Sequence, residues 1–342
     1  MRLHALAMAA LLATPVAASA QDSFTCAAAP EPVMSLAYGS RYAEGDASRS
    51  ELDTTADAEA DDALRPIDDF LRDLTETANT VLDEGTDKAA VADCLVGQMA
   101  AWARADAMGD LQSPTSNLTI GARIAGFGLV LLQVQDHSRM EAEKAEITGW
   151  LQRLMQAQLV FWEEEAPDGA RQGNLRAWAA LAASTTAALT DDAVMRGWAA
   201  WSVSYILCKA EADGSLPQEM SRGKYALKYQ LHSIAPMAVS VLLLDRQGIA
   251  LQGSCSNALA RIVGFAVEDL AEGRITAQIT GKTQSFFDGT DELEGFHLAW
   301  LEAYLLLEPE GASALNQLAE TYRPLNFSKL GGNQTLLWQA LR

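Results

Sequence analysis

Two residues near the middle of the chain, Arg222 and Tyr229, have the types and the spacing to remove a weakly acidic proton. They follow a turn signal at Asp213-Gly214 and a polar helix start, and they are separated by about two helical turns. We therefore expect both side chains on one face of a helix, roughly 10 Å apart along its axis. In that arrangement a phenol can act as a base beside a fixed positive charge.

The elements that must position these residues are helices. Apolar residues recur at three- and four-residue intervals along the chain, as in Ile67-Phe70-Leu71-Leu74 and Ile147-Trp150-Leu151-Leu154, and no convincing run alternates with a period of two. Glycine, proline and aspartate residues separate these segments at short intervals. We predict an all-α protein built of helical hairpins, whose ring has an inner and an outer face and a cleft formed by loops at one end.

The charge of the chain restricts its partners. A formal net charge of −20 argues against nucleic acid. The same charge opposes a polyanionic sugar at long range, although salt screens that repulsion over about 8 Å. A site for an acidic sugar would therefore need a local cluster of Arg and Lys. No stretch after the N-terminus reaches the length of a membrane span, so we expect no spanning helix.

The N-terminus has the pattern of a secretory leader. Arg2 supplies the positive start, residues 3–16 form an apolar stretch, and Ala18-Ser19-Ala20 is an A-x-A cleavage site before Gln21. The alternative, a short membrane anchor, is disfavoured because the apolar run is short and no stop-transfer flank follows it. We predict a cleaved signal peptide at residues 1–20, an N-terminal segment with a possible lid loop at 21–62, one helical domain at 63–342, and a periplasmic or secreted protein.

The four cysteines, Cys26, Cys94, Cys208 and Cys255, are too widely spaced for a CxxC metal or redox motif. In an oxidising compartment they are plausible disulfide partners, as Cys26–Cys94 and Cys208–Cys255. Four cysteines allow three pairings, so the sequence does not fix these two, and buried free thiols stay an alternative.

Residues 213–229, DGSLPQEMSRGKYALKY, resemble the signature DGxLPxE…RGxxALxY of the alginate lyase family of polysaccharide lyases. Further segments agree in order, and they are residues 40–42, 46–49, 66–71, 78–79, 94–103 and 299–304. The resemblance spans most of the mature chain. It implies an (α/α) toroid, or incomplete barrel, of helical hairpins, an exported lyase that cleaves mannuronan or alginate, and no cofactor.

Two segments depart from the family pattern. The family carries Asn-Asn-His followed by Trp three residues later, whereas this chain has Gly173-Asn174-Leu175 before Trp178. The family's YHxY is Tyr229-Gln230-Leu231-His232 here. Leu175 in place of the histidine puts the family's usual substrate in doubt. Glucuronan is therefore a second candidate substrate, and a non-catalytic protein that binds an acidic exopolysaccharide is a candidate of another class.

The chemistry of β-elimination explains why these residue types would be needed. A uronic acid loses its C5 proton only if the attached carboxylate is neutralised, which Asn174 and Arg222 can do. A base then takes H5 and an acid protonates the departing O4. In β-mannuronate and β-glucuronate these atoms lie on the same side, so Tyr229 alone can do both. A free phenol has a pKa of about 10 and needs a nearby cation to ionise usefully.

Other residues are candidates for binding the substrate. Arg176 and Arg123 are possible cations of the cleft, and Arg41 with Tyr42 can close over the sugar from the N-terminal segment. His232 can orient the phenol or replace the absent histidine ring, and Trp178 and His297 are possible subsite residues; for all of these a structural role is the alternative. With three scattered histidines in the mature chain and no HExxH motif, we expect no metal site. The expected partner is an acidic polysaccharide, and the protein is expected to be a monomer.

Overall fold

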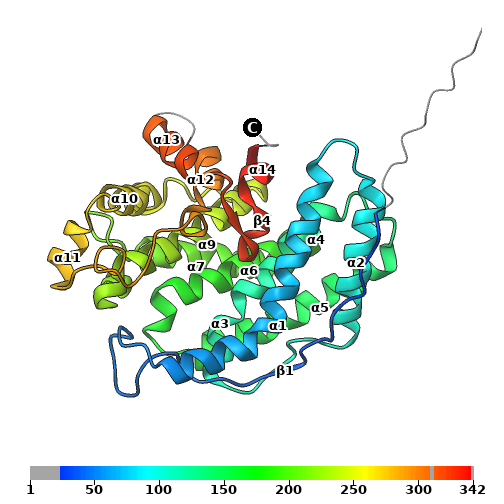
Figure 1. Ribbon diagram of the computed structural model, residues 1–342, viewed down its shortest axis with the longest axis horizontal. Coiled ribbons are helices and arrows are strands. Elements are labelled where there is room, and N and C mark those ends of the chain that lie inside the picture. The colour runs from blue at the N-terminus through cyan, green and yellow to red at the C-terminus, as the bar shows by residue number, and fades with distance from the viewer. Residues whose placement is uncertain (1–23, 309–311, 340–342) are drawn as a thin grey trace, which may run out of the picture.

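The protein is a ring of helical hairpins in a computed structural model that describes residues 24–308 and 312–339 (Figure 1). The predicted leader lies outside the described residues. The long helices are α1 (Thr54–Asn79), α2 (Lys88–Arg104), α4 (Gly121–Val134), α5 (Glu141–Val160), α6 (Asn174–Thr190), α7 (Ala193–Leu207), α9 (Ala226–Arg246), α10 (Ser254–Asp269) and α13 (Ser313–Tyr322). Shorter helices are α3 (Pro114–Thr119), α8 (Pro217–Met220), α11 (Arg274–Thr280), α12 (Leu301–Leu307) and α14 (Gln334–Gln339).

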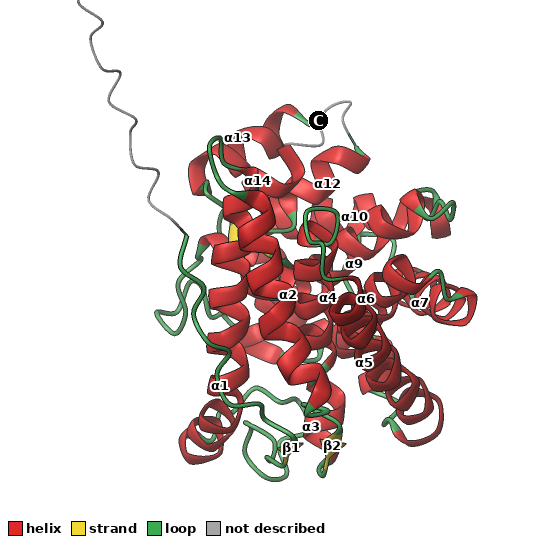
Figure 2. Cartoon of the chain, turned by 90° about the vertical axis from the view of Figure 1, so that its right-hand side faces the viewer, coloured by secondary structure: helices red, strands yellow, loops and turns green. Residues whose placement is uncertain are grey.

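Strands and short 3-10 or π-helical turns complete the described chain. The strands are β1 (Ser35–Leu36), β2 (Asp110–Leu111), β3 (Asn326–Phe327) and β4 (Gly332–Asn333), with β1 parallel to β2 and β3 antiparallel to β4. The turns are η1 (Thr80–Leu82), η2 (Phe161–Glu165), η3 (Ala170–Gln172), η4 (Gly223–Tyr225), η5 (Gly295–Leu298) and η6 (Ser328–Leu330), and η2 is the π-helical one. Figure 2 shows how little of the chain is strand, which confirms the predicted all-α class.

Helices of the ring alternate between an inner and an outer layer. The inner helices α1, α4, α6, α9 and α12 pack on one another in that order. Each is followed by an outer partner that packs behind it or behind its neighbour, as α5 and α7 do on α6 and α10 does on α9. This arrangement is the predicted toroid of helical hairpins. Figure 1 shows the chain passing around it from α1 and α2 to α10 and the C-terminal helices.

Inner helices are buried on almost every side because they have neighbours in both layers. Of α4, the residues from Gly121 to Leu131 are all buried, and α6 and α9 are buried over most of their lengths. A helix that is apolar all round requires such enclosure. One segment, Gly223–Arg246, is long and apolar enough to cross a membrane, yet 83 % of its apolar window is buried inside the protein.

The first helix begins earlier than the sequence suggested. We expected the helical domain to begin at residue 63, but α1 begins at Thr54, and the Asp53 side chain accepts hydrogen bonds from Thr55 N and Ala56 N at the start of this helix. Aspartate is a strong N-cap, and alanine and glutamate are good helix formers, so the sequence from Asp53 carries local signals for a helix.

Two disulfides join the cysteines, Cys26 to Cys94 and Cys208 to Cys255, which is the pairing that the sequence made plausible but did not fix. The first ties the N-terminal segment to α2. The second joins the ends of α7 and α10 in the outer layer. Both cross-links close long loops, and such closure destabilises the unfolded chain.

The turn at Gly214 places the segment that leads to Arg222. Gly214 has φ +95°, and a Cβ there would overlap the backbone carbonyl of Arg261. Gln230 of α9 donates to the Gly214 carbonyl, so the turn is also fixed to the inner layer.

Gly214→Ala should therefore lower the free energy of unfolding by about 3 kcal/mol, because alanine is strained at this φ and meets backbone that cannot move aside. Gly264→Ala is the matched control, since Gly264 lies in α10 and no atom lies near the position of the missing Cβ. This variant should raise the free energy of unfolding by about 1 kcal/mol, because alanine favours the helix over glycine. Urea unfolding measures both changes. Equal stability of the two variants would contradict the role assigned to Gly214.

Candidate active site

Arg222 and Tyr229 lie together, though not on one continuous helix. The chain turns through η4 after Arg222, with Gly223 at φ +58°, and α9 begins only at Ala226. The expected separation of roughly 10 Å on one helix face is therefore wrong. The Arg222 guanidinium instead folds over the Tyr229 ring, with its carbon 3.6 Å from the ring centroid.

A loop from the N-terminus closes over this pair. In the N-terminal loop (residues 40–53), the Tyr42 hydroxyl is hydrogen-bonded to the Tyr229 hydroxyl. The buried Arg222 donates from Nε to the Ser48 carbonyl at 3.1 Å and from Nη2 to the Arg49 carbonyl at 3.0 Å. Arg222 thus holds the loop with its N–H groups while its face covers the phenol.

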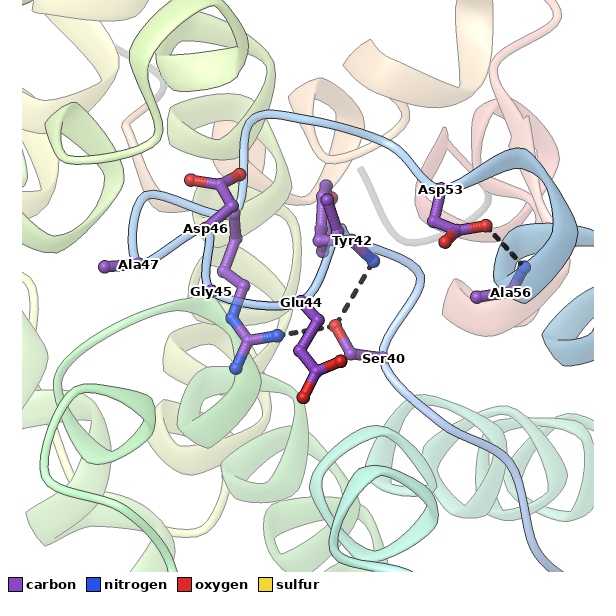
Figure 3. Close-up of a pocket in the computed structure, with 10 residues that line it drawn as sticks. Ser40, Tyr42, Glu44, Gly45, Asp46, Ala47, Asp53 and Ala56 are labelled. Atoms are coloured by element: carbon purple, nitrogen blue, oxygen red, sulfur yellow. Dashed lines mark hydrogen bonds between the residues drawn. The ribbon is translucent and has the colours of Figure 1, made fainter.

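Internal hydrogen bonds give the N-terminal loop its shape. The Asp46 carboxylate accepts from the backbone N–H of Ser48, Ser50 and Glu51, which holds the pKa of Asp46 well below its usual range, with the Ser48 hydroxyl as the largest cause. Figure 3 shows this loop, with Ser40 bonded to the Tyr42 backbone N–H. The loop is therefore a folded unit, and a sugar that reaches the Tyr229 hydroxyl must displace that of Tyr42.

Beside the phenol lies a cavity of about 250 Å³, called the groove below. Its walls come from α9, from η5 and from the C-terminal turn around β3 and η6. The lining residues are Lys228, Tyr229, Leu231, His232, Ala235, Phe296, His297, Phe327 and Lys329.

His232 is held in one neutral form. The Trp178 indole N–H donates to His232 Nε2 at 2.9 Å, so the ring proton must be on Nδ1. Burial, followed by the nearby charge of Lys329, lowers the pKa of His232 to about 3. Trp178 itself is buried, and it contributes to the groove by orienting this ring.

A second neutral imidazole, that of His297, lines the groove. The Glu294 backbone N–H donates to His297 Nδ1 at 3.1 Å, which leaves the ring proton on Nε2. Burial, with the charge of Lys228 next, lowers the pKa of His297 to about 4. Nε2 is buried and has no hydrogen-bond partner among the described residues. An unpartnered buried N–H donor beside a cavity points to a ligand acceptor.

Two lysines supply positive charge to the groove. Lys228 pairs with Asp291 at 2.7 Å, and Lys329 lies 3.6 Å from Asp68. Burial, with the charge of Arg123 next, lowers the pKa of Lys329 to about 8. The lining thus carries two cationic groups and two neutral N–H donors, a local donor surface on a strongly acidic protein.

Asn174 begins α6 and is 4 % exposed. Its backbone N–H and its Nδ2 both donate to the carboxylate of Glu219, while Oδ1 has no partner among the described residues. Leu175, next along the helix, packs against the small apolar cluster around Phe161 and Trp162. Leu175 is therefore part of a core contact, and its side chain supplies no polar group to the site.

Three arginines that were predicted to bind the substrate form ion pairs within the fold. Arg176 is buried, donates to Glu163 at 2.7 Å and stacks on Trp201. Arg123 forms a two-pronged ion pair with Asp68, and Arg41 pairs with acidic residues in the first turns of α1. Arg176, Arg123 and Arg41 do not line the groove. Arg176 and Arg123 were assigned from their charge, and Arg41 from its place in the N-terminal segment. Each charge is instead neutralised by a carboxylate contact within the fold.

The sequence analysis did not identify four residues of this region, Lys329, Phe327, Phe296 and Glu219. Lys329 and Phe327 reach the groove because the β3–β4 hairpin turns back against the inner helices α1, α4 and α9. No local spacing could signal that approach across a hundred residues of chain. Glu219 stands within the signature around Arg222, and that position was a signal that could have drawn attention to it.

Comparison with known proteins finds one family model and several relatives that are similar to this chain. The family model described as Alginate lyase matches residues 115–276, which include Asn174, Arg222 and Tyr229. The chain is 27 % identical over 338 residues to a polysaccharide lyase of Stenotrophomonas maltophilia (strain K279a), covering 96 % of this chain and 95 % of that protein. It is 26 % identical over 327 residues to an alginate lyase of Pseudomonas syringae pv. syringae (strain B728a), covering 92 % and 83 %.

Solved structures with the same architecture include alginate lyase A1-III from Sphingomonas species A1, with a TM-score of 0.73, 19 % identity, and coverage of 90 % of this chain and 86 % of that one. A histidine-to-alanine variant of alginate lyase A1-III complexed with a tetrasaccharide gives a TM-score of 0.78 at 21 % identity, covering 91 % and 85 %. These similarities show that the chain has the (α/α) toroid fold.

Proposed function

We infer that this chain, a polysaccharide lyase that carries an alginate lyase family domain, cleaves β-1,4-linked polyuronate by β-elimination, with mannuronan as the first candidate substrate. The observation that carries this proposal is the Arg222 guanidinium stacked on the Tyr229 ring beside the groove. Tyr229 is proposed as the group that moves the proton, and Arg222 and Asn174 as the groups that bear the substrate's negative charge.

The reaction needs a base and charge neutralisation at the same sugar. Loss of H5 places negative charge on C5 and, by delocalisation, on the attached carboxylate. N–H donors directed at that carboxylate are worth most when they are fixed before the charge develops. Arg222 and Asn174 are both buried and fixed by hydrogen bonds, which suits them for this task.

Tyr229 can serve as base and then as acid because H5 and O4 of a β-mannuronate residue lie on the same side. The phenolate takes H5, the C4–O4 bond breaks as the C4–C5 double bond forms, and the phenol returns its proton to O4. A positive charge against the ring favours negative charge on the phenol oxygen during this step. Burial, with Tyr229 next, raises the pKa of Tyr42, so its hydroxyl stays protonated and can donate to Tyr229.

The polar groups of the groove suit an acidic sugar. Lys228 and Lys329 offer charge for carboxylates, and the imidazole N–H groups of His232 and His297 offer donors for carboxylates or hydroxyls. Aromatic rings of Phe296 and Phe327 supply apolar surface between them. This local donor cluster offsets the repulsion expected from the acidic remainder of the protein.

Leu175 supports a second candidate. The family pattern has a histidine at this position, beside Asn174, as a donor for mannuronan cleavage. Here the side chain is apolar and packs into the fold, so that donor is missing. Glucuronan is therefore the alternative substrate for the same chemistry. A protein that binds an acidic exopolysaccharide without cleaving it is the alternative of another class.

Export to the periplasm or the medium is part of the proposal. The leader pattern at residues 1–20 motivates it, and two disulfides are in keeping with an oxidising compartment. Detection of a mature N-terminus at Gln21 in the periplasmic fraction of a bacterial host would test it. A chain that retains Met1 in the cytoplasm would count against export.

A panel of polyuronates tests the reaction. Elimination leaves a conjugated, unsaturated uronate at the new end, so ultraviolet absorbance should rise with mannuronan and, for the alternative, with glucuronan. Guluronan is the matched control, because there H5 and O4 lie on opposite sides and a single phenol cannot serve both. Binding to mannuronan without any rise on mannuronan, glucuronan or mixed alginate would favour the binding protein.

Lys329 predicts how substrate binding changes with pH. Because its pKa is lowered to about 8, Lys329 is charged below that pH and loses its charge as the pH rises through it. KM for the acidic substrate should therefore rise above pH 8, and Lys329→Arg should remove that rise because a guanidinium stays charged. Lys88→Met, at the exposed start of α2, is the control. An alkaline rise unchanged by Lys329→Arg would show that another group is responsible.

A further inference from the structure

Glu219 is a fully buried carboxylate that none of the proposed steps uses. It lies at the end of α8, and three donors converge on it. Oε1 accepts from the Asn174 backbone N–H at 2.8 Å and from the Ser233 hydroxyl at 2.8 Å, and Oε2 accepts from Asn174 Nδ2 at 3.0 Å. Two of the three bonds therefore hold one residue of the candidate site.

The local fold is shaped to admit this carboxylate. Gly173 precedes Asn174, and a Cβ at Gly173 would overlap Glu219 Oε1. Asn174 is the first residue of α6, so its backbone N–H is at the positive end of the helix dipole, where a carboxylate is stabilised. Glu219 thus caps α6 from another segment of the chain. The same carboxylate also holds the Asn174 side chain, through its bond to Nδ2.

The bonding pattern fits an ionised Glu219. An ionised carboxylate can accept all three hydrogen bonds, whereas a protonated carboxyl group also needs an acceptor for its own proton. The unpartnered acceptor beside Glu219 is Asn174 Oδ1. Donation to Oδ1 would require the Asn174 amide to turn over. Burial raises the pKa of Glu219, and the three donors and the charge of Arg222 oppose that rise. Arg222, which lies between α8 and η4, is the charged group that lowers the pKa of Glu219 against the effect of burial.

We propose that Glu219 is a positioning residue, whose carboxylate fixes the Asn174 amide so that the second N–H of Nδ2 stays directed at the substrate's carboxylate. This inference rests on the proposed elimination reaction. Nδ2 carries two protons, and Glu219 accepts one of them. The other has no acceptor among the described residues, so it is available as the donor that stabilises the charge formed when H5 leaves.

Glu219→Gln should lower kcat by about tenfold or more with little change in KM, because a neutral amide partner lets the Asn174 amide adopt both orientations. In the unaltered protein kcat should fall as the pH is lowered through the pKa of Glu219, and this acid limb should be absent from the variant. Glu302→Gln is the matched control, because Glu302 is a buried carboxylate paired with Arg323. It should leave the acid limb in place.

Ser233→Ala provides a second variant if Glu219→Gln does not fold. It removes one donor to the ionised Oε1, so the acid limb should move to higher pH. An acid limb that stays where it was would overturn the assignment of this limb to Glu219. So would a folded Glu219→Gln protein with unaltered kcat across the pH range.

A measurement on the free protein separates this inference from the reaction itself. With asparagine side chains labelled with ¹⁵N, and the signal assigned by its loss in Asn174→Ala, the Asn174 amide should shift with pH in the unaltered protein and not in Glu219→Gln. A shift without cleavage of any polyuronate would reject the lyase proposal and keep the Glu219–Asn174 coupling. Cleavage without a shift would overturn the coupling alone.

Discussion

Tyr229→Phe should lower the rate of unsaturated uronate formation by about 10³ while the protein still binds polyuronate. The loss is expected because the phenol both removes H5 and protonates O4, so the phenyl ring leaves neither step with a proton carrier. Removal of the hydroxyl does not empty the groove, whose charged and N–H groups stay in place. KM, or the affinity measured by calorimetry, should therefore change little.

Two tyrosines close to Tyr229 give matched controls. Tyr225 lies one helical turn before Tyr229, is buried and does not line the groove. The Tyr225→Phe variant should therefore form unsaturated uronate at nearly the rate of the unaltered protein. Tyr42→Phe removes the hydroxyl bonded to Tyr229, and its effect should be smaller than that of Tyr229→Phe. Absorbance assays at saturating substrate compare the three. If Tyr229→Phe retained the rate, the assignment of the base would be wrong.

The helical architecture was readable from sequence because its signals are local. Apolar spacings such as Ile147, Trp150 and Leu154 depend only on which face of a helix meets the core, and these residues are buried in α5 as expected. The pairing of Arg222 with Tyr229 was also readable, but its geometry was not. Gly223 at positive φ breaks the helix between them, and the side-chain stack follows from that turn rather than from helix periodicity.

The predictions that were based only on the charge of a residue were the least reliable. Arg176 and Arg123 were proposed as cleft cations, yet each is paired with a carboxylate that arrives from another helix or turn, Glu163 and Asp68 respectively. A single arginine in the sequence does not reveal which carboxylate the fold brings beside it. Lys329 was missed for the converse reason, because only the folding of the C-terminal hairpin brings it near α9.

Arg222 links three parts of the site, and each link is a separate contact. Its plane lies over Tyr229, its N–H groups hold the carbonyls of Ser48 and Arg49, and its charge acts on Glu219. A lysine carries the same charge but cannot stack as a plane and donate in a fork at the same time. We therefore expect the reaction rate to depend on the shape of the side chain at position 222 as well as on its charge.

Arg222→Ala should lower kcat by about 10² to 10³, because the charge beside the phenol and the donor for the substrate's carboxylate are lost together. Arg222→Lys should recover only a small part of this loss. Arg49→Ala is the matched control, because it keeps the backbone carbonyl that Arg222 holds and removes only an exposed side chain bonded to Ser40. Steady-state kinetics on mannuronan separate kcat from KM. Full recovery in Arg222→Lys would mean that positive charge alone, without the stacked guanidinium, is what the phenol requires.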